Sequence, residues 1–436
     1  MSLLRMKKLF KNIVVKVLTW EAKVALKKHA PKIIAVTGNV GKTSTKDAIY
    51  EVVSSAFSAR KSQKSMNSEI GLPLTILGLD NAWGSLGGWV SNLCEGFKVA
   101  FFAKDFPEWL VLEVGADHPG DIESVSHWLF PDVVVLTRMS DVPVHMEYFT
   151  DAAAVLREKM FLAQALKPTG TLIVNSDDPL FMKATQSMPC TKVFYGEAQG
   201  SLVQIIESKV VYGDGALPLP VGQGALMNIK GVQENISLHG VLGAHLMYSI
   251  AAACAVGKVL GIESKYSGVF RDFETPRGRM RILPGISASA IIDDTYNSSP
   301  LACAEALRAL GSLSIRGRKV AVLADMKELG DEAEKAHRTI GRRAFEYLHT
   351  LVTVGDMGRF IAEGAREAGM ANDRIHSYQT ADEAALALVD MVRAGDVVLV
   401  KGSQSMRMER VSKALLEDKA KAEELLVRQE KEWTVR

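Results

Sequence analysis

Residues 33–49, IIAVTGNVGKTSTKDAI, constrain the fold of this chain more than any other stretch. An apolar run typical of a buried strand leads into a glycine-rich turn, and a stretch with helical character follows. The glycines let the backbone turn tightly, so that several N–H groups point toward one anion at the positive end of the helix. The sequence therefore predicts a phosphate-binding loop.

The side chains of this loop fit a nucleotide that is bound together with Mg²⁺. Lys42 can reach the terminal phosphates, and the Thr43 hydroxyl can bind the cation. The usual pattern, G-x-x-x-x-G-K-[ST], has glycine where this chain has Val36. A glycine-rich turn without a ligand is the disfavoured alternative, because strand, loop, Lys-Thr pair and helix coincide. We expect the phosphates of a nucleotide to be held by Gly38, Asn39, Gly41, Lys42, Thr43 and Ser44.

Length and composition limit the number of domains and the kinds of partner and compartment to be expected. A chain of 436 residues is too long for one ordinary core, so two or three domains are expected. The net charge of +2 argues neither for nor against a polyanionic partner, and we expect no nucleic acid. The four cysteines form no C-x-x-C pair, which fits a reducing cytoplasm without a zinc site or disulfide framework.

Alternating strand-like and helical patterns from residue 33 onward predict an α/β fold with a mostly parallel sheet. Residues 190–240 are rich in glycine, valine and serine, and they predict an antiparallel β-rich section in the first domain. Proline and glycine at 274–278 mark a domain boundary. Expected strands are 32–36, 109–114, 133–137, 171–175, 289–293, 319–323 and 397–401, and expected helices include 151–166, 301–310 and 332–347.

These patterns divide the chain into four parts. Residues 1–31 form a basic amphipathic helix, and residues 32–275 form the central ATP-binding domain. Residues 276–415 form a smaller Rossmann-like α/β domain. Residues 416–436 are expected to form a charged, solvated helix, supported by pairs such as Glu417/Lys421 and Glu424/Arg428.

Two segments leave alternatives open. Residues 1–30 hold seven lysines and one arginine against one acid, Glu21, with apolar residues at helical spacing. The favoured interpretation is a helix packed on the next domain, and the alternative is a helix lying on the inner membrane surface. Residues 83–109 carry seven aromatic side chains. Core packing of an insertion is favoured there over contact with a partner or a membrane.

Two further residues follow predicted strands and could ligate a metal. Glu113 ends the strand in LVLEVGADHPGDI, and His145 lies downstream of the next strand in RMSDVPVHMEYF. The carboxyl ends of parallel strands meet at the ligand-binding edge of such a sheet. One carboxylate and one imidazole there could hold a second cation beside the phosphates, although a lone histidine is more often structural.

Ten short motifs occur in the order typical of Mur ligases, and the chain resembles most closely the branch that adds D-alanyl-D-alanine. The resemblance covers residues 32 to about 415. The motifs are TGNVGKTS (37–44), MNSEIGLPLTIL (66–77), LEVGADHPGDI (112–122), VHMEYF (144–149), REKMFLAQAL (157–166), VNSDDP (174–179), PRGRM (276–280), IIDDTYNSSP (291–300), ADMKELG (324–330) and VLVKGSQSM (398–406).

The resemblance implies ATP-dependent amide-bond formation through an acyl phosphate, with ATP and Mg²⁺ as cofactors. It implies catalytic roles for Lys42, Glu113, His145 and Lys159, and metal ligation by Thr43, Glu113, His145 and Lys159 if that lysine is carbamylated. It places Asn67, Glu69, Arg279 and Asp294 at the nucleotide. Asn297, Lys401 and Ser403 are expected near the substrates, a peptide carboxylate and an amino acid or a D-Ala-D-Ala dipeptide.

The chain departs from the family pattern in two places. GAHLMYS (243–249) keeps His245 but has Leu246 and Ser249 where asparagines are common, which puts hydrogen bonds near the adenine in question. About thirty residues precede the phosphate loop, where the typical member has a complete UDP-binding domain. Whether the carboxylate substrate is UDP-linked is therefore left open, with a lipid-linked or free peptide as the alternative.

Two other functions compete with a cell-wall ligase. Folylpolyglutamate, cyanophycin-type and poly-γ-glutamate synthetases also begin near their phosphate loop, but they match ADMKELG and DDTYNSSP less well. A degenerate nucleotide-binding scaffold subunit is disfavoured because Lys42, Thr43, Glu113, His145 and Lys159 are intact. We expect a monomeric cytoplasmic ligase, with peripheral contact to the inner membrane through residues 1–30 as an open alternative.

Overall fold

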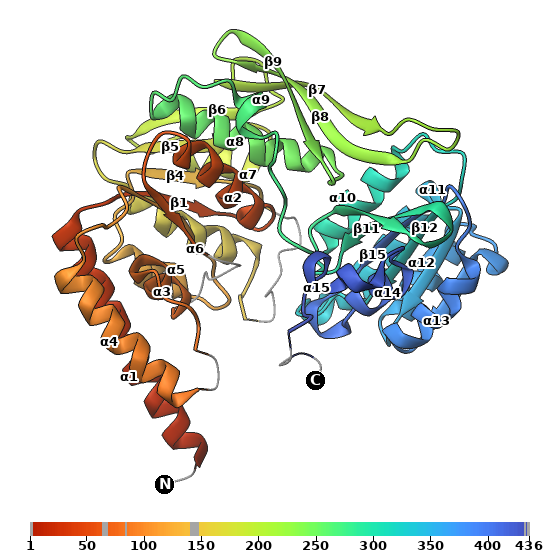
Figure 1. Cartoon of the computed structure of the whole chain (residues 1–436), viewed down its shortest axis with the longest axis horizontal. Coiled ribbons are helices and arrows are strands. Elements are labelled where there is room, and N and C mark those ends of the chain that lie inside the picture. Colours follow the sequence, from red (N-terminus) through yellow and green to blue (C-terminus); the bar gives the residue numbers. More distant parts are fainter. Residues whose placement is uncertain (1–2, 63–68, 83–84, 140–147, 431–432, 434–436) are drawn as a thin grey trace.

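Two sheets with helices on their faces form the body of the molecule (Figure 1). The computed structural model describes residues 3–62, 69–82, 85–139, 148–430 and 433, with side chains from residue 10 onward in the first segment. The larger sheet belongs to the first domain and the smaller sheet to the second. The predicted α/β class is confirmed.

The first sheet has nine strands in the order β2-β3-β1-β4-β5-β6-β7-β8-β9. It is parallel from β2 to β7, and β7, β8 and β9 are antiparallel, as expected for residues 190–240. The strands are β1 (Lys32–Thr37), β2 (Ala59–Lys61), β3 (Trp109–Glu113), β4 (Val133–Leu136), β5 (Thr171–Asn175), β6 (Thr191–Gly196), β7 (Val203–Tyr212), β8 (Pro220–Ile229) and β9 (Val232–His239).

Helices cover both faces of this sheet, because successive side chains of a strand point to opposite sides. Ile34 and Val36 of β1 join a core with α2 and α8, while Ile33 and Ala35 join a separate core with α1, α3 and α4. The helices of this domain are α1 (Leu3–His29), α2 (Lys42–Ser54), α3 (Gly71–Leu77), α4 (Leu86–Phe102), α5 (Asp121–Ser126), α6 (Ala152–Gln164), α7 (Pro179–Thr185), α8 (Ala244–Val259) and α9 (Tyr266–Val269).

The second sheet has six strands in the order β10-β11-β15-β12-β13-β14, and only the β10–β11 pair is antiparallel. Its elements are β10 (Arg281–Gly285), η1 (Ile286–Ala288), β11 (Ser289–Asp294), α10 (Pro300–Gly311), β12 (Lys319–Ala324), η2 (Gly330–Glu332), α11 (Ala333–Tyr347), β13 (Thr350–Val354), α12 (Gly358–Glu367), η3 (Asn372–Arg374), β14 (Ile375–Tyr378), α13 (Ala381–Met391), β15 (Val397–Lys401), η4 (Gln404–Met406) and α14 (Glu409–Leu415).

The C-terminal residues do not form the single solvated helix that was expected. Helix α14 ends at Leu415, and only η5 (Lys419–Lys421) and α15 (Ala422–Leu425) follow in the described part. Leu416 and Leu426 are buried in the second domain's core. Each buried leucine contributes about 1.5–3 kcal/mol, against roughly 0.2–0.5 kcal/mol for an exposed i,i+4 charge pair. Burial therefore decides the path of the chain.

Arg428 shows the same preference for long-range contacts. Its guanidinium lies buried, donates to the carbonyls of Thr295 and Tyr296, and forms an ion pair with Glu409 at 3.1 Å. The expected partner of Arg428 was Glu424, one helical turn earlier. The structure instead uses Arg428 to tie the C-terminal segment to the end of β11.

Helices α1 and α4 lie side by side and extend from the body as a helical arm, a name used below for these two helices (Figure 1). Val14, Leu18 and Ala22 of α1 are buried in the core of the first domain, which confirms the favoured interpretation of a packed helix. The Lys28 ammonium donates to the Phe101 carbonyl and so joins the two helices. None of the described helices is both long enough and apolar enough to cross a bilayer.

Glu21 is a buried acid at the contact between the two helices of the arm. A Cβ atom on Gly96 would lie 2.1 Å from the Glu21 carboxylate, so glycine is needed there for close approach. Burial raises the pKa of Glu21 from 4.5 to about 7. The carboxyl is therefore harder to ionise in the folded chain than in the unfolded chain, and ionisation reduces stability as the pH rises through this window.

We expect Glu21→Gln to stabilise the protein at pH 8 by up to about 3 kcal/mol and to change little near pH 4, where the carboxyl is protonated in both states. Thermal midpoints measured at both pH values test this. The exposed Glu95 on α4 is the matched control, because Glu95→Gln should leave the midpoint nearly unchanged at either pH. Equal effects of Glu21→Gln at both pH values would contradict the inference that ionisation of the buried Glu21 carboxyl destabilises the fold.

Candidate active site

The predicted phosphate loop connects β1 to α2, and the end of β4 holds its shape. The Asn39 N–H donates to the Arg138 carbonyl at 2.7 Å, and the Thr137 hydroxyl donates to the Val40 carbonyl at 2.8 Å. Gly38 has a φ of 146°, and a Cβ there would lie 2.0 Å from the Thr137 hydroxyl oxygen. The loop therefore requires glycine at position 38 for both its conformation and its contact with β4.

Helix α2 begins directly after the left-handed Gly41, and Lys42 is its first residue. The Lys42 ammonium donates to the Asn39 carbonyl at 3.2 Å, so the side chain folds back over the loop. Burial lowers the pKa of Lys42, the negative charge of Glu113 opposes that shift, and the positive charge of Arg279 adds to it. Lys42 therefore interacts electrostatically with two other predicted site residues, one from each domain.

Glu113 lies at the end of β3, directly beside the loop, because β3 pairs with β1 and Glu113 is opposite Val36. Its side chain is buried, with 1% of its surface exposed. Among the described residues, no group of three or more histidine, cysteine, aspartate and glutamate side chains is arranged to hold a metal. His145, the expected companion of Glu113, lies outside the described residues, so the predicted pair of ligands stays a prediction.

Helix α6 places Lys159 in the same region. The Lys159 side chain is buried, so it does not lie on the solvent-exposed surface of the helix. Burial lowers the pKa of Lys159 to about 7, the positive charge of Lys42 adds to the shift, and Glu158 and Asp117 oppose it. A lysine with this pKa is a neutral amine in a large fraction of molecules near pH 7.

Sequence reasoning missed Glu158 and Asp117, although both lie within quoted motifs. The Glu158 carboxylate accepts hydrogen bonds from the N–H groups of Gly120, Ile122 and Glu123, at 3.0, 2.6 and 3.1 Å. It thereby fixes the first turn of α5 against α6, one residue before Lys159. Asp117 acts electrostatically on both Lys42 and Lys159. A carboxylate that accepts hydrogen bonds from backbone N–H groups cannot be recognised from any pattern of residue types in the sequence.

Ser249, which stands where related chains often have asparagine, has a structural role here. It lies in α8, and its hydroxyl oxygen accepts a hydrogen bond from the Thr45 hydroxyl at 3.0 Å. Thr45 is in the first turn of α2, so this contact joins α8 to the helix that follows the phosphate loop. His245, four residues earlier in α8, is influenced by Asp294 and Lys401 of the second domain, and burial lowers its pKa.

In the second domain, Asp294 and Lys401 bind each other. The Lys401 ammonium lies 2.5 Å from the Asp294 carboxylate and also donates to the Asn297 carbonyl at 3.0 Å. Sequence reasoning assigned Asp294 to ATP and Lys401 to the incoming substrate, and their mutual contact was not foreseen. Arg279, also expected at ATP, stacks over the Tyr296 ring at 4.3 Å.

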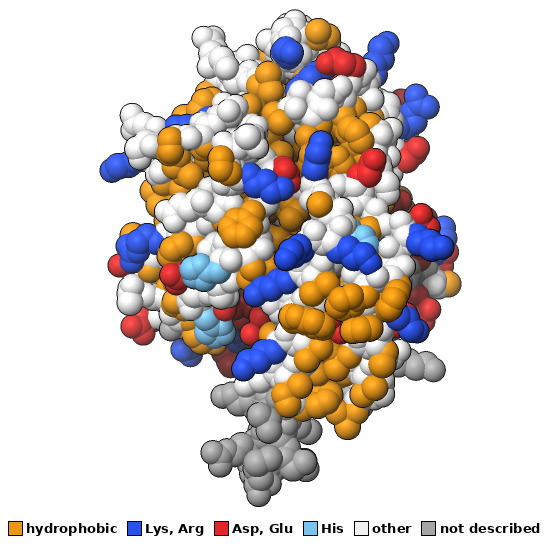
Figure 2. Space-filling view, turned by 90° about the vertical axis from the view of Figure 1, so that its left-hand side faces the viewer, with side chains coloured by type: hydrophobic (Ala, Val, Ile, Leu, Met, Phe, Trp, Pro, Cys, Tyr) orange, Lys and Arg blue, Asp and Glu red, His pale blue; other side chains and the backbone are white. Residues whose placement is uncertain are grey.

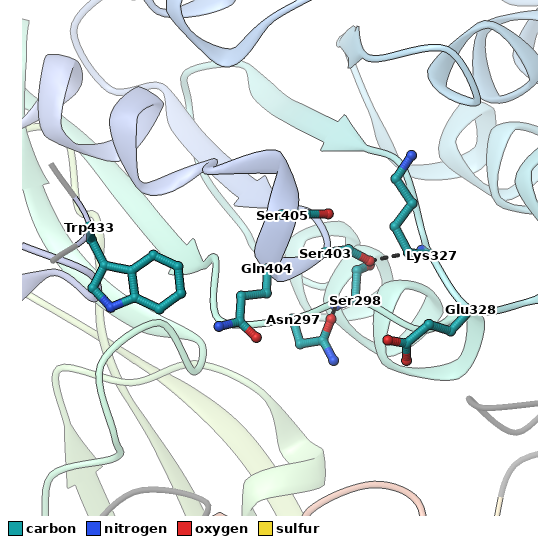
Figure 3. Close-up of a pocket in the computed structure, with 8 residues that line it drawn as sticks. All are labelled: Asn297, Ser298, Lys327, Glu328, Ser403, Gln404, Ser405 and Trp433. Atoms are coloured by element: carbon teal, nitrogen blue, oxygen red, sulfur yellow. Dashed lines mark hydrogen bonds between the residues drawn. The ribbon is translucent and has the colours of Figure 1, made fainter. Parts of the chain in front are cut away.

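A polar pocket of about 280 Å³ lies in the second domain (Figure 3). The Ser403 hydroxyl accepts a hydrogen bond from the Lys327 N–H at 2.9 Å, which fixes one wall. The Trp433 ring lies at the opposite end of the group from Lys327 and Glu328 (Figure 3). The lining residues are Asn297, Ser298, Lys327, Glu328, Ser403, Gln404, Ser405 and Trp433.

The remaining predicted residues are not placed at the phosphate loop. Asn67 lies outside the described residues. Glu69 is exposed and forms an ion pair with Lys11 of α1 at 2.9 Å. Its predicted contact with the nucleotide therefore stays a prediction, and the contact that the structure shows joins this segment to the helical arm.

Comparisons with known proteins agree with this architecture. A model of the Mur ligase middle domain matches residues 93–257, and a model described as Mur ligase, glutamate ligase domain, matches residues 278–404. The chain is 30% identical over 399 residues to the UDP-N-acetylmuramoyl-tripeptide–D-alanyl-D-alanine ligase of Bacillus subtilis. That match covers 91% of this chain and 78% of the relative.

Solved structures give the same result. A MurF ligase from Thermotoga maritima in complex with ADP matches with a TM-score of 0.74 and 25% identity, covering 94% of this chain and 84% of that one. A folylpolyglutamate synthase from Mycobacterium tuberculosis shares the fold, with a TM-score of 0.64 and 16% identity over 94% of this chain and 97% of that one. The ordered motifs, the two domain models and the long alignment lead to one conclusion: this chain belongs to the Mur ligase family of ATP-dependent ligases.

Proposed function

We propose that this enzyme joins D-alanyl-D-alanine to the carboxylate of a peptidoglycan precursor peptide. The observation that carries the proposal is the electrostatic interaction of Lys42 with Glu113, Lys159 and Arg279, beside a loop where Glu113 ends the strand next to β1. Two cationic side chains from different domains beside a phosphate loop suit a reaction between two anions, a carboxylate and ATP.

The proposed reaction has two steps. The peptide carboxylate attacks the γ-phosphorus of ATP, the bond to the β-phosphate oxygen breaks, and ADP leaves an acyl phosphate on the peptide. The amine of the dipeptide then attacks the activated carbonyl carbon, forms the C–N bond and loses a proton as phosphate departs. Lys42 and Arg279 would offset the repulsion between the carboxylate and the γ-phosphate and stabilise the charge that develops on the transferred group.

The residues present fit Mg²⁺, which prefers oxygen ligands. Thr43 supplies a hydroxyl at the start of α2, and Glu113 supplies a buried carboxylate beside the loop. In the proposed site these two residues hold cations together with His145 and with Lys159 if it is carbamylated. A bound divalent cation would neutralise phosphate charge and polarise the γ-phosphoryl group.

Lys159 suits carbamylation because only a neutral amine attacks CO₂. The nitrogen lone pair bonds to the carbon of CO₂ and one N–H proton is lost, so the neutral amine becomes an anionic carbamate. Counted from the ammonium form, two protons are released. Burial already lowers the pKa of this amine to about 7, so the cost of removing its proton is small. The positive charge of Lys42 would then favour the carbamate, whereas it disfavours the ammonium.

We assign the incoming amine to the polar pocket of the second domain. Asn297 and Ser403 line this pocket, and Lys401 acts from behind it by holding the Asn297 carbonyl. In this proposal the Glu328 carboxylate accepts hydrogen bonds from the ammonium of the dipeptide, while the Lys327 ammonium is held by the Asp325 carboxylate at 2.8 Å. The proposed enzyme is a cytoplasmic monomer, and its peptide carboxylate is UDP-linked, as in the names of its relatives.

A phosphate-release screen tests the function. UDP-linked and free peptides are each paired with D-alanyl-D-alanine, with single amino acids and with glutamate. We expect release only when D-alanyl-D-alanine is paired with the UDP-linked peptide, whose C-terminal carboxylate is free. A pteroate-type acceptor is included with glutamate, and release with that pair would instead support the folylpolyglutamate-type reaction, whose synthase shares the fold. If no pair causes phosphate release, the ligase proposal is contradicted and the nucleotide-binding scaffold subunit is supported instead.

A further inference from the structure

Large apolar side chains are exposed together on the helical arm, away from the phosphate loop and the pocket. Phe102 has 70% of its surface exposed, and Trp20 has 49%. Figure 2 shows a broad apolar area low on this face of the molecule, with lysine and arginine side chains at its border. The exposed apolar residues of the arm are Ile13, Trp20, Leu86, Val90, Phe97 and Phe102.

Ring contacts unite the two helices into one surface. The Trp20 ring of α1 lies 5.9 Å from the Phe101 ring of α4, and Phe101 lies 4.6 Å from Phe97. Gly96 of α4 is buried against Glu21 of α1, whereas the neighbouring Phe97 has 44% of its surface exposed. The arm therefore presents a preformed aromatic ridge that needs no rearrangement to become exposed.

The positive charge of the chain is concentrated on α1, one of the two helices of the arm. Helix α1 contains eight lysine and arginine residues and one glutamate, which gives +7, whereas the whole chain carries +2. The remaining residues therefore carry −5. The exposed Lys16 and Lys23 lie one helical turn to either side of Trp20, and the exposed Lys98 follows Phe97 on α4. Apolar rings bordered by ammonium groups match the layered chemistry of a bilayer surface that contains anionic lipid.

We propose that the helical arm is a peripheral membrane anchor, in which Trp20, Phe97 and Phe102 enter the headgroup region while the lysines bind anionic lipid. Aromatic side chains are enriched at this depth of a membrane. The opposite charge of the body is repelled by the same surface, so the enzyme would bind in one orientation, arm first. This inference goes beyond the ligation reaction and does not depend on it.

Flotation with lipid vesicles tests the anchor. The full chain is mixed with vesicles that contain phosphatidylglycerol and, separately, with vesicles of phosphatidylcholine alone. We expect binding to the anionic vesicles that weakens at high salt, and little binding to the neutral ones. Phe97→Ser combined with Phe102→Ser should lower the bound fraction on the order of tenfold. The matched control is Leu386→Ser on α13, an apolar residue that is 75% exposed outside the arm.

The charge contribution is tested separately. Lys16→Glu with Lys27→Glu should abolish binding to anionic vesicles, while Lys183→Glu with Lys209→Glu, an equal change of charge at exposed positions elsewhere, should not. Phosphate release with a substrate in solution and the thermal midpoint should be unchanged in all variants, which shows that each one folds. Absence of binding by the full chain, equal losses in the controls, or self-association through Phe97 and Phe102 without lipid would overturn the proposal.

Discussion

Lys42→Ala is expected to reduce phosphate release and ligation by at least about 100-fold in kcat, because in the proposed site the ammonium would stabilise charge that develops on the transferred phosphoryl group. The loop itself should keep its shape, since the Thr137 hydroxyl and the Arg138 carbonyl hold its backbone. Burial of the Lys42 ammonium lowers its pKa, so its removal should not lower the thermal midpoint. Steady-state kinetics and thermal unfolding measure the two effects.

The control for this variant is Lys183→Ala, which removes an exposed lysine at the end of α7. Its kcat should equal that of the original enzyme. Normal product formation by Lys42→Ala would remove the phosphate-loop assignment. A loss of activity that follows a loss of folded protein would show that Lys42 acts on stability and not on the reaction.

Lys159→Ala should lower kcat by a factor on the order of 100, because in the proposed site it would remove the carbamate that would help to hold Mg²⁺ near the γ-phosphate. Short carboxylic acids such as formate or acetate should restore part of the activity, since each can place a carboxylate in the space left by the shortened side chain. The same acids should not rescue Lys42→Ala, which lacks a cation and not an anion.

The unchanged enzyme offers an independent test of the same residue. Because carbamylation needs the neutral amine and the pKa of Lys159 is about 7, the carbamate is less saturated at pH 6 than at pH 8. A partial lowering of the CO₂ concentration should therefore reduce activity by a larger factor at pH 6. Mass spectrometry of the intact chain near neutral pH should show an added carboxyl group that Lys159→Ala lacks. An unaffected rate in the alanine variant would remove the carbamate from the mechanism.

Much of the fold could be predicted because a parallel sheet buried on both faces consists of continuous apolar runs. The strands expected at 171–175 and 397–401 have those bounds in the structure. The C-terminal helix could not be predicted in the same way. The i,i+4 charge pairs are visible in the sequence, whereas the contact of Arg428 with Glu409 and Thr295 depends on a fold that brings distant residues together.

The site residues show the same difference between local sequence patterns and contacts that depend on the fold. Lys42 was predicted from local chemistry, because the loop, its glycines and the helix are contiguous. The burial of Lys159 depends on how α6 packs against the sheet, which the sequence does not indicate. Lys159 was assigned to the site only through the resemblance to the family. Glu158 was not predicted because its hydrogen-bond partners are backbone N–H groups at the start of α5. Such groups are present in almost every residue, so no sequence pattern marks them. Likewise, nothing local indicates that Asp294 and Lys401 bind each other.

The separation of charge between α1 and the rest of the chain also bears on purification. An isoelectric point near 8.2 suggests weak retention on a cation exchanger at neutral pH. A resin, however, contacts one face of a protein at a time, and the face that carries α1 has a far higher density of positive charge than the average. The protein should therefore elute from a cation exchanger at a higher ionic strength than its isoelectric point suggests, and at low ionic strength it should also adhere to an anion exchanger.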